Sequence, residues 1–405
     1  MPSPTPSPAG THDPPVSSTV PRRVLPVIVL AQLAGTSPWF AVNAVMADLQ
    51  RERGYGPADL GSLTSAVQLG FIAGTLVFAL FGVADRFSAR RVFLACALAS
   101  AVVTALSVPL AGSFAALWVC RAVGGFFLAG IYPVGMKIAA QWYSRGLGAA
   151  LGLLIGALVL GSASPHALRA WGTEAGWAQV FYVVALLSAS AGVLLVVAVP
   201  EPARPNAPRG RSMVLTPRAL VSMVTEPRLR ASVFGYFGHM WELYTLWVLV
   251  PLIVAMHWRG TAASWVAFAV IAAGAVGCAG GGWLSLRWGS ARVAGAQLAT
   301  SGLCCLAAPW ALQLPPAGFL AWLMLWGITV AGDSPQFSTL TARNAPPVAQ
   351  GSVLTLTNSI GFAISIVSIQ LFVALAQHVE LASLLPWLAL GPALGLIALR
   401  PLLRV

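Results

Sequence analysis

Residues 201–230 read EPARPNAPRGRSMVLTPRALVSMVTEPRLR, the longest polar stretch between apolar segments of the chain. On each side of it lie six apolar runs, and each run is long enough for a helix across a bilayer core, which needs about 20 residues. The runs before it are 24–48, 60–84, 91–112, 114–140, 147–168 and 176–199, and those after it are 231–256, 262–285, 292–313, 316–341, 351–375 and 382–401. This pattern predicts an all-α membrane protein with twelve transmembrane helices in two groups of six.

The composition is that of a chain surrounded by lipid. Hydrophobic residues make up 58% of the 405 residues and charged residues only 8%, whereas a water-soluble domain has about 25% charged residues. The net charge of +12 does not indicate nucleic-acid binding, because the basic residues lie in short segments between the apolar runs. The five cysteines have no metal-ligand spacing, so neither a metal nor another cofactor is expected.

The arginines indicate the orientation of the chain. With a cytoplasmic N-terminus, the cytoplasmic segments hold Arg22, Arg23, Arg86, Arg90, Arg91, Arg145, Arg204, Arg209, Arg211, Arg218, Arg228, Arg230, Arg287, Arg292, Arg343, Arg400 and Arg404. The opposite segments hold only Arg51, Arg53, Arg169 and Arg259. Because cytoplasmic loops of membrane proteins carry an excess of basic residues, we expect both termini and the central linker in the cytoplasm.

The two halves of the chain repeat. A shift of 202 residues pairs AGIYP at 129–133 with AGDSP at 331–335, and a shift of 201 residues pairs Arg86 with Arg287. An even number of spans separates the copies, so the two six-helix bundles are expected to be pseudo-symmetric about an axis along the membrane normal. The expected parts are a disordered cytoplasmic tail at 1–21, an N-terminal bundle at 22–200, a cytoplasmic linker at 201–230 and a C-terminal bundle at 231–405.

The loop FGVADRFSARRV at 81–92 resembles the signature G-x-L-a-D-R-x-G-R-K of the major facilitator superfamily. Asp85, Arg86 and Arg90 match it, whereas two glycine positions of the signature carry other residues. The segment LWVCRAVGG is similar to a second pattern of that superfamily, with Arg121 as its intramembrane arginine. The resemblance implies a secondary transporter that works by alternating access. It also implies a conformational latch at Asp85, Arg86 and Arg90.

Four further stretches, GTSPWFAVNAV, AGIYPVGMK, GYFGHMWELY and GDSPQFS, look like a group of bacterial permeases distantly related to cyanate and nitrate/nitrite carriers. This resemblance implies transport by a monomer in the bacterial cell inner membrane. Nitrate is disfavoured as the solute, because the second and eighth spans contain no arginine before the loops that follow them. The eleventh span also lacks the glycine-rich asparagine motif of those carriers.

Only four formally charged residues lie well inside the spans, namely Arg121, Lys137, Glu242 and Asp333. A charge at that depth is unfavourable unless it faces protein or water, so each is a candidate functional residue. The four fall on the fourth, seventh and tenth spans. In the family that the sequence resembles, these spans and the first line the central cavity.

Glu242 lies near the bilayer midplane, and His239 lies one helical turn before it, where it could share a proton with a carboxylate. Either Glu242 forms a buried pair with a histidine or an arginine that fixes helix packing, or it binds substrate charge or carries a coupling proton. We favour the second reading, with Asp333 across the cavity. Asp333 lies beside Pro335, at an expected kink, and either lines the cavity there or forms a salt bridge between helices.

Arg121 and Lys137 lie about 160° apart on an ideal helix, so both cannot face one cavity unless the helix bends. We place Arg121 in the cavity, and expect Lys137 to extend toward the membrane surface or to pair with a neighbouring span. The uncharged candidates for stacking and hydrogen bonding are weaker, because ordinary packing explains each of them as well. They are Trp39, Asn43, Tyr132, Trp241, Tyr244 and Gln336.

These features predict a proton-coupled secondary transporter of a small polar, anionic or zwitterionic, solute. The alternative is a proton-driven efflux permease for a toxic compound or drug, and a transporter-like receptor is less favoured. The sequence has no Ser/His/Asp cluster, metal-ligand spacing or Walker motif, so an enzyme is not expected. The expected partners are the solute, protons and the lipid bilayer, without nucleic acid.

Overall fold

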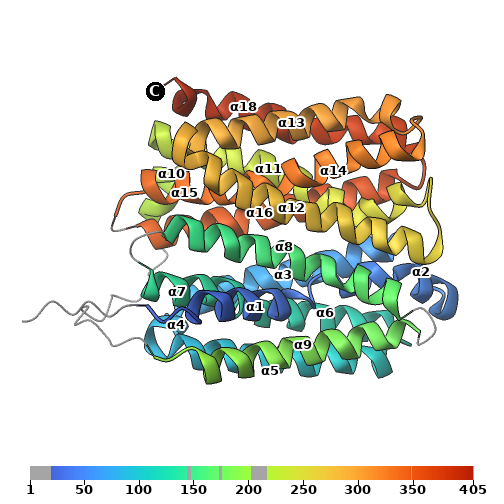
Figure 1. Cartoon of the computed structure of the whole chain (residues 1–405), viewed down its shortest axis with the longest axis horizontal. Helices are drawn as coiled ribbons and strands as arrows, with labels where there is room; N and C mark the ends of the chain where they lie inside the picture. The colour runs from blue at the N-terminus through green and yellow to red at the C-terminus, as the bar shows by residue number, and fades with distance from the viewer. Residues whose placement is uncertain (1–19, 144–146, 173–175, 202–216, 348, 405) are drawn as a thin grey trace, which may run out of the picture.

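The computed structural model describes residues 20–404 except 144–146, 173–175, 202–216 and 348. These described residues fold into helices that run side by side along the long axis of the molecule (Figure 1). The first half contains α1 (Val24–Thr36), α2 (Ala41–Arg53), α3 (Asp59–Leu80), α4 (Val83–Arg86), α5 (Ala89–Leu110), α6 (Phe114–Leu128), α7 (Tyr132–Trp142), α8 (Leu147–Trp171) and α9 (Trp177–Ala198). The second half contains α10 (Pro217–Thr225), α11 (Pro227–Val254), α12 (Gly260–Trp288), α13 (Ser290–Ala311), α14 (Pro316–Gly332), α15 (Ser334–Asn344), α16 (Gln350–Leu375), α17 (Leu381–Leu384), the 3-10 helix η1 (Leu385–Ala389) and α18 (Leu390–Leu403).

Eleven helical stretches in the described part of the chain are long and apolar enough to cross a membrane. The predicted all-helical membrane class is therefore confirmed. The predicted run 292–313 forms α13, which has 22 residues but is not one of the eleven. Two of its polar side chains bond to other helices: Gln297 Nε2 donates to the carbonyl oxygen of Gly277 on α12 at 3.1 Å, and Ser301 donates to Glu242 on α11.

Three spans are each built from two helices that meet at a break. The breaks separate α1 from α2, α6 from α7, and α14 from α15, and a proline lies at or just after each one. Proline has no N–H and removes a helical hydrogen bond, which favours a break at these positions. Proline is not sufficient for a break, since Pro165 and Pro251 lie inside the continuous helices α8 and α11. The breaks after α6 and α14 fall in the segments 129–133 and 331–335, which the 202-residue shift pairs.

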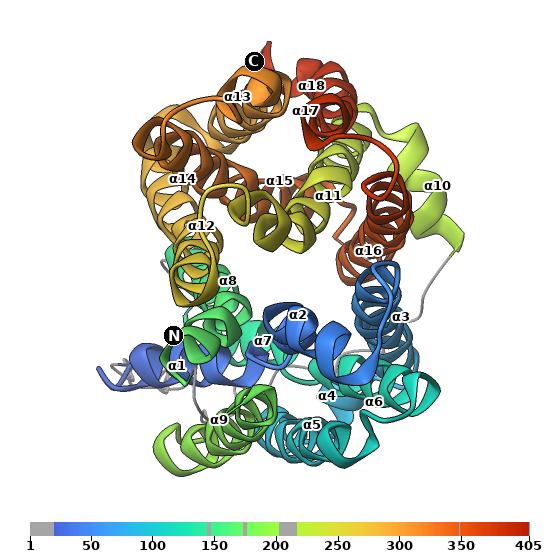
Figure 2. The ribbon, with the colours of Figure 1, turned by 90° about the vertical axis from the view of Figure 1, so that its right-hand side faces the viewer.

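Figure 2 shows the helices of the first half gathered on one side of the molecule and those of the second half on the other. The two halves meet where α8 packs along α12 and α3 packs along α16. The first of these contacts includes Gly156 of α8, where an added Cβ atom would lie 3.5 Å from the carbonyl oxygen of Ala275, at ordinary van der Waals distance. Helices with such small residues can approach closely in a membrane.

The expected tail at 1–21 falls largely outside the described residues, as do residues 202–216 of the expected linker at 201–230. Within the linker, residues 217–225 form α10, and α11 begins at Pro227 rather than at 231. Ala219 and Met223 on α10 are buried in a cluster with Leu229 and Val233 of α11, whereas Leu220 and Val224 are exposed. α10 and α4 lie at the same end of the molecule (Figure 1). We call this end the arginine-rich end, because Arg86, Arg90, Arg91, Arg228, Arg230, Arg287 and Arg292 lie there.

Candidate functional site

A small cavity lies between the two halves of the chain. Its wall is formed by α7 and α8 of the first half and by α11, α16 and the α14–α15 break of the second half. The cavity volume is about 20 Å³, room for about one water molecule. In this conformation the two halves are therefore closed around the cavity.

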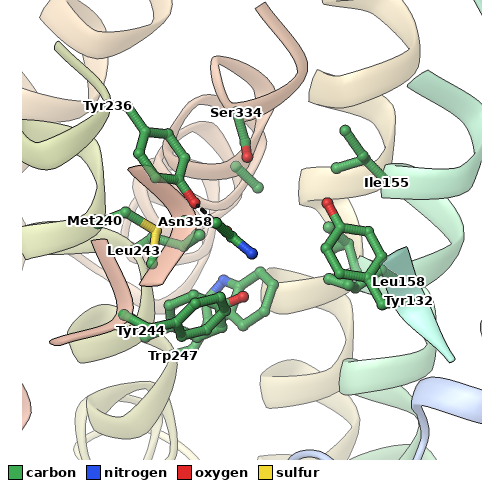
Figure 3. A pocket seen from close by; sticks show the side chains of 13 residues that line it. Tyr132, Ile155, Leu158, Tyr236, Met240, Leu243, Tyr244, Trp247, Ser334 and Asn358 are labelled. Carbon is green, nitrogen blue, oxygen red and sulfur yellow. Dashed lines mark hydrogen bonds between the residues drawn. The ribbon is translucent and has the colours of Figure 1, made fainter. Parts of the chain in front are cut away.

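The wall is aromatic and polar (Figure 3). α11 contributes Tyr236, Met240, Leu243, Tyr244 and Trp247, which recur every three or four residues and so share one face of the helix. Tyr132 begins α7 on the other side of the cavity, and Ser334 begins α15 directly after the break. The residues that line this cavity include no acidic or basic side chain within the described part of the chain.

Three polar groups of the wall are placed by specific contacts. The hydroxyl of Tyr236 donates to Oδ1 of Asn358 on α16 at 2.9 Å. This bond turns the amide nitrogen of Asn358 toward the middle of the cavity (Figure 3). Trp247 is almost completely buried, and its indole N–H has no hydrogen-bond partner among the described residues.

An aromatic layer closes the cavity toward the end opposite the arginine-rich end. Trp39 and Phe40 come from the turn between α1 and α2, whereas Tyr244 and Phe362 come from the second half. The ring centroids of Trp39 and Phe362 are 5.5 Å apart, and those of Phe40 and Tyr244 are 6.1 Å apart. The layer therefore joins the two halves through ring contacts, which prefer offset or tilted geometries at such distances.

Glu242 lies inside the second half and not in the cavity wall. Its Oε1 accepts hydrogen bonds from Trp326 Nε1 on α14 at 2.6 Å, from Cys305 Sγ on α13 at 3.2 Å, and from the hydroxyl of Ser301 on α13. The residue is 1% exposed. Three donors on two neighbouring helices thus hold this carboxylate, and α11 turns its aromatic face, not Glu242, toward the cavity.

His239 pairs with Asp333 rather than with Glu242. Its Nδ1 lies 2.7 Å from Asp333 Oδ1, and both side chains are 1% exposed. Asp333 occupies the break between α14 and α15, directly before Ser334 in the cavity wall. Asp333 therefore contacts a histidine of another helix in this conformation, one residue away from the cavity wall.

Arg121 also lies outside the cavity wall. Its guanidinium is buried and donates to the carbonyl oxygens of Pro38 at 2.9 Å and Trp39 at 2.5 Å. These carbonyls belong to the turn between α1 and α2, where regular helical bonds end. In this conformation Arg121 therefore binds carbonyl acceptors of the broken first span instead of lining the cavity.

Lys137 and the signature loop are joined. Lys137 on α7 forms an ion pair with Asp85 and donates to the carbonyl oxygen of Ala84 at 2.5 Å. Arg90 donates to the carbonyl oxygen of Val196 at 2.5 Å and lies 3.5 Å from a carboxylate oxygen of Glu201. The third signature residue, Arg86, is exposed at the end of α4. Lys137 was expected to extend toward the membrane surface or to pair with a neighbouring span, and its partner here lies in the loop after the second span.

The uncharged candidates divide between the cavity and the packing of the bundles. Tyr132 and Tyr244 line the cavity, and Trp39 belongs to the aromatic layer beside it. Asn43 instead bonds to Thr64, with its Nδ2 3.0 Å from Thr64 Oγ1.

Trp241 and Gln336 are not in the cavity wall. Trp241 packs edge-on against Phe372 with ring centroids 6.0 Å apart, and Gln336 is buried on α15. In this conformation both side chains are therefore packed against other parts of the protein and do not line the cavity.

Sequence reasoning did not single out Tyr236, Ser334 or Asn358, which supply hydroxyl and amide groups to the wall. Tyr236 could have been found from its spacing, because it lies eight residues, or about two helical turns, before Tyr244 and so shares a helix face with it. Asn358 had no such signal, because a single asparagine in an apolar helix is compatible with packing and with binding.

The sequence profile of the Major Facilitator Superfamily matches residues 28–369. The chain belongs to this superfamily, and it is a multi-pass membrane transporter with an all-helical fold. No sequence among the curated proteins that were compared matches the chain.

Two solved structures resemble the chain over nearly its whole length. One is the crystal structure of a bacterial homologue of the human lysosomal transporter Spinster, in an inward-facing and unoccupied conformation, with a TM-score of 0.69, 17% identity, and coverage of 96% of this chain and 98% of that chain. The other is the human organic anion transporter MFSD10 (TETRAN), with a TM-score of 0.70, 15% identity, and coverage of 93% and 99%. At these identities the likeness defines the fold alone.

Proposed function

We propose that the chain is a secondary active transporter that moves a small polar solute across a bacterial inner membrane by alternating access. In this proposal twelve spans form two pseudo-symmetric bundles, 22–200 and 231–405, joined by a cytoplasmic linker at 201–230. The observation that carries the proposal is the cavity between the halves, with Tyr132 on one side and Tyr236 on the other. A site built from both halves changes its access when the halves rock against each other.

The transporter couples solute movement to protons through the buried acidic residues of the second half. Asp333 supports this role because it lies at the break between α14 and α15 and directly precedes Ser334 of the cavity wall. A change of protonation at the His239–Asp333 pair alters the ion pair at that break. Ionisable groups buried in the membrane with one specific partner are typical of proton relays.

Glu242 is the second proton-coupling group in this proposal. Its three donors lie on α13 and α14, so a change in its charge alters the contacts of α11 with both helices. Asp85, Arg86 and Arg90 form the latch at the cytoplasmic end, where the ion pair from Asp85 to Lys137 supports their role. The protein acts as a monomer in this scheme.

Proton-driven export of a toxic compound or drug is the second candidate function. The uncharged aromatic wall of the cavity favours it, because an apolar solute needs no fixed charge for binding. Direction of transport separates it from uptake. In inside-out vesicles that contain the protein, an exporter that exchanges solute for protons would accumulate a radiolabelled solute when the lumen is acidic, whereas an uptake carrier that moves solute together with protons would accumulate it when the lumen is alkaline.

Distance measurements between spin labels test alternating access without knowledge of the solute. One pair, at Ser113 and Thr261, spans the two halves at the end opposite the arginines, and another pair, at Arg91 and Arg292, spans them at the arginine-rich end. We expect one distance to lengthen when the other shortens between acidic and alkaline pH. Distances that stay fixed, or that change together, would contradict the proposal.

A further inference from the structure

We infer that the central cavity binds an uncharged, flat aromatic solute that carries hydrogen-bond acceptors. The inference rests on the proposed transport function and replaces the anionic or zwitterionic solute expected from the sequence. It depends on three properties of the cavity wall: its lack of charge, its surplus of hydrogen-bond donors and its aromatic surfaces.

The first property is the absence of charged side chains among the described residues of the cavity wall. The charged side chains that the sequence placed in the cavity are held elsewhere: Arg121 by the α1–α2 turn, Glu242 by α13 and α14, and Asp333 by His239. The residues described around the cavity include no other ionisable acid or base that could balance a charged solute. Transfer of an ion from water into such a site is strongly unfavourable, so the wall discriminates against anions and cations alike.

The second property is the surplus of donors. Tyr236 donates to the carbonyl oxygen of Asn358 and so occupies the main acceptor of that amide, whose nitrogen points into the cavity (Figure 3). The indole N–H of Trp247 is buried without a hydrogen-bond partner among the described residues. The hydroxyl groups of Tyr132 and Tyr244 can add further donors, since both side chains line the cavity. A buried donor without a partner is unfavourable, so a carbonyl or ring-nitrogen acceptor on the solute would satisfy this wall.

The third property is the arrangement of rings. Tyr244, Trp247 and Phe362 lie together beside the cavity, with ring centroids 5.1 Å apart for Tyr244 and Phe362 and 5.4 Å apart for Tyr244 and Trp247. Aromatic faces bind flat apolar rings by stacking or edge contacts. The cavity volume of about 20 Å³ is too small for such a solute, so binding requires the halves to separate first. Tyr132, which comes from the first half, would then close onto a solute held by the second half.

Three probes that share one ring and differ in charge test the inference. They are benzamide, which is neutral and carries a carbonyl acceptor, benzoate, which is an anion, and benzamidine, which is a cation. Binding of each to the purified full-length chain in lipid nanodiscs is measured by titration of intrinsic tryptophan fluorescence and by equilibrium dialysis. We expect benzamide to bind at least about tenfold more tightly than either ion, because neither ion finds a counter-charge in the wall.

Two variants and a control connect the binding to this cavity. Tyr132→Phe and Asn358→Leu each remove a donor from the wall, and each should weaken benzamide binding about fivefold. Tyr55→Phe is the matched control, since its hydroxyl bonds to the carbonyl oxygen of Ala111 outside the cavity. This control should bind benzamide as the unaltered chain does.

Several outcomes would overturn the inference. On the unaltered chain, the inference fails if benzoate or benzamidine binds more tightly than benzamide, if all three probes bind equally, or if no probe binds. These three results do not depend on whether a variant folds. Loss of benzamide binding in Tyr55→Phe as well as in Tyr132→Phe would place the site elsewhere. The spin-label distances judge alternating access separately, so a transporter that prefers benzoate would retain the proposed function and lose only this solute class.

Discussion

His239 Nδ1 lies 2.7 Å from Asp333 Oδ1, and this contact joins the middle of α11 to the break between α14 and α15. Both side chains are almost completely removed from solvent. The pair lies beside two residues of the cavity wall, since Ser334 follows Asp333 and the ring of Tyr236 is 5.7 Å from that of His239. A change of charge at the pair would therefore act on both sides of the wall.

Asp333→Asn should uncouple transport from protons. The substitution keeps the size of the side chain but removes its charge and its titration, so in proteoliposomes the accumulation ratio of a transported solute under a pH gradient should fall to about one. Exchange of labelled for unlabelled solute should continue, because it needs no net proton movement. Continued accumulation in Asp333→Asn would assign a packing role to this residue.

Glu242→Gln should also abolish proton-driven accumulation while sparing exchange. Glutamine still offers an oxygen to Trp326 and Ser301, so helix packing is retained better than in an alanine variant. Glu226→Gln is the control, because Glu226 is exposed at the start of α11. A Glu242→Gln protein that accumulates solute as the control does would leave the coupling role to the His239–Asp333 pair alone.

Arg121→Lys should destabilise the protein. Arginine donates to two carbonyl oxygens of the α1–α2 turn at once, which a lysine ammonium cannot match in the same planar geometry. Loss of one hydrogen bond from a charged donor costs about 1.5–3 kcal/mol, which lowers the thermal unfolding midpoint in detergent. Arg259→Lys, at an exposed position, should unfold as the unaltered chain does. An unchanged midpoint for Arg121→Lys would show that the turn holds without this residue.

Asp85→Asn should slow turnover and leave the affinity for solute largely unchanged. The substitution weakens the contact between the signature loop and Lys137 at the arginine-rich end, and neither residue belongs to the cavity wall. The double exchange Asp85→Lys with Lys137→Asp restores opposite charges and should recover part of the rate. If Asp85→Asn turns over normally, the basic residues of the loop act as anchors to anionic lipid instead.

Cysteines placed at two threonines test the orientation. Thr225 lies at the end of α10 near the arginines, and Thr261 lies at the start of α12 at the opposite end; both are exposed. In a background without the native cysteines, a membrane-impermeant maleimide should label Thr261→Cys in intact cells and Thr225→Cys only after lysis. The reverse pattern would invert the proposed topology, in which arginine-rich loops are cytoplasmic.

The sequence predicted those features that depend on residues near each other in the chain. The apolar runs predicted the spans, and Pro335, two residues after Asp333, predicted a kink where α14 and α15 meet, because proline removes a helical hydrogen bond. The loop that pairs with Lys137 follows the second span, and the sequence did not name Asp85 as the partner.

The partners of the other buried charges could not be predicted in the same way. Glu242 could have faced the cavity or the bundle, and the choice depends on donors that α13 and α14 place beside it. Arg121 binds carbonyl oxygens of a turn that is distant in the sequence, and every residue has a backbone carbonyl, so the sequence does not show which carbonyls will accept a hydrogen bond. Tyr236 and Asn358 carry no charge, so composition alone does not separate them from packing residues.

The polar face of α13 has a consequence for biogenesis. Gln297 and Ser301 find their partners on α12 and α11, and α13 is absent from the stretches apolar enough to cross a membrane by composition. Such a helix partitions poorly into lipid by itself, because each unpaired polar group is costly in hydrocarbon. During synthesis α13 would therefore enter the bilayer together with α11 and α12, which leave the ribosome first and already carry the acceptors that it needs.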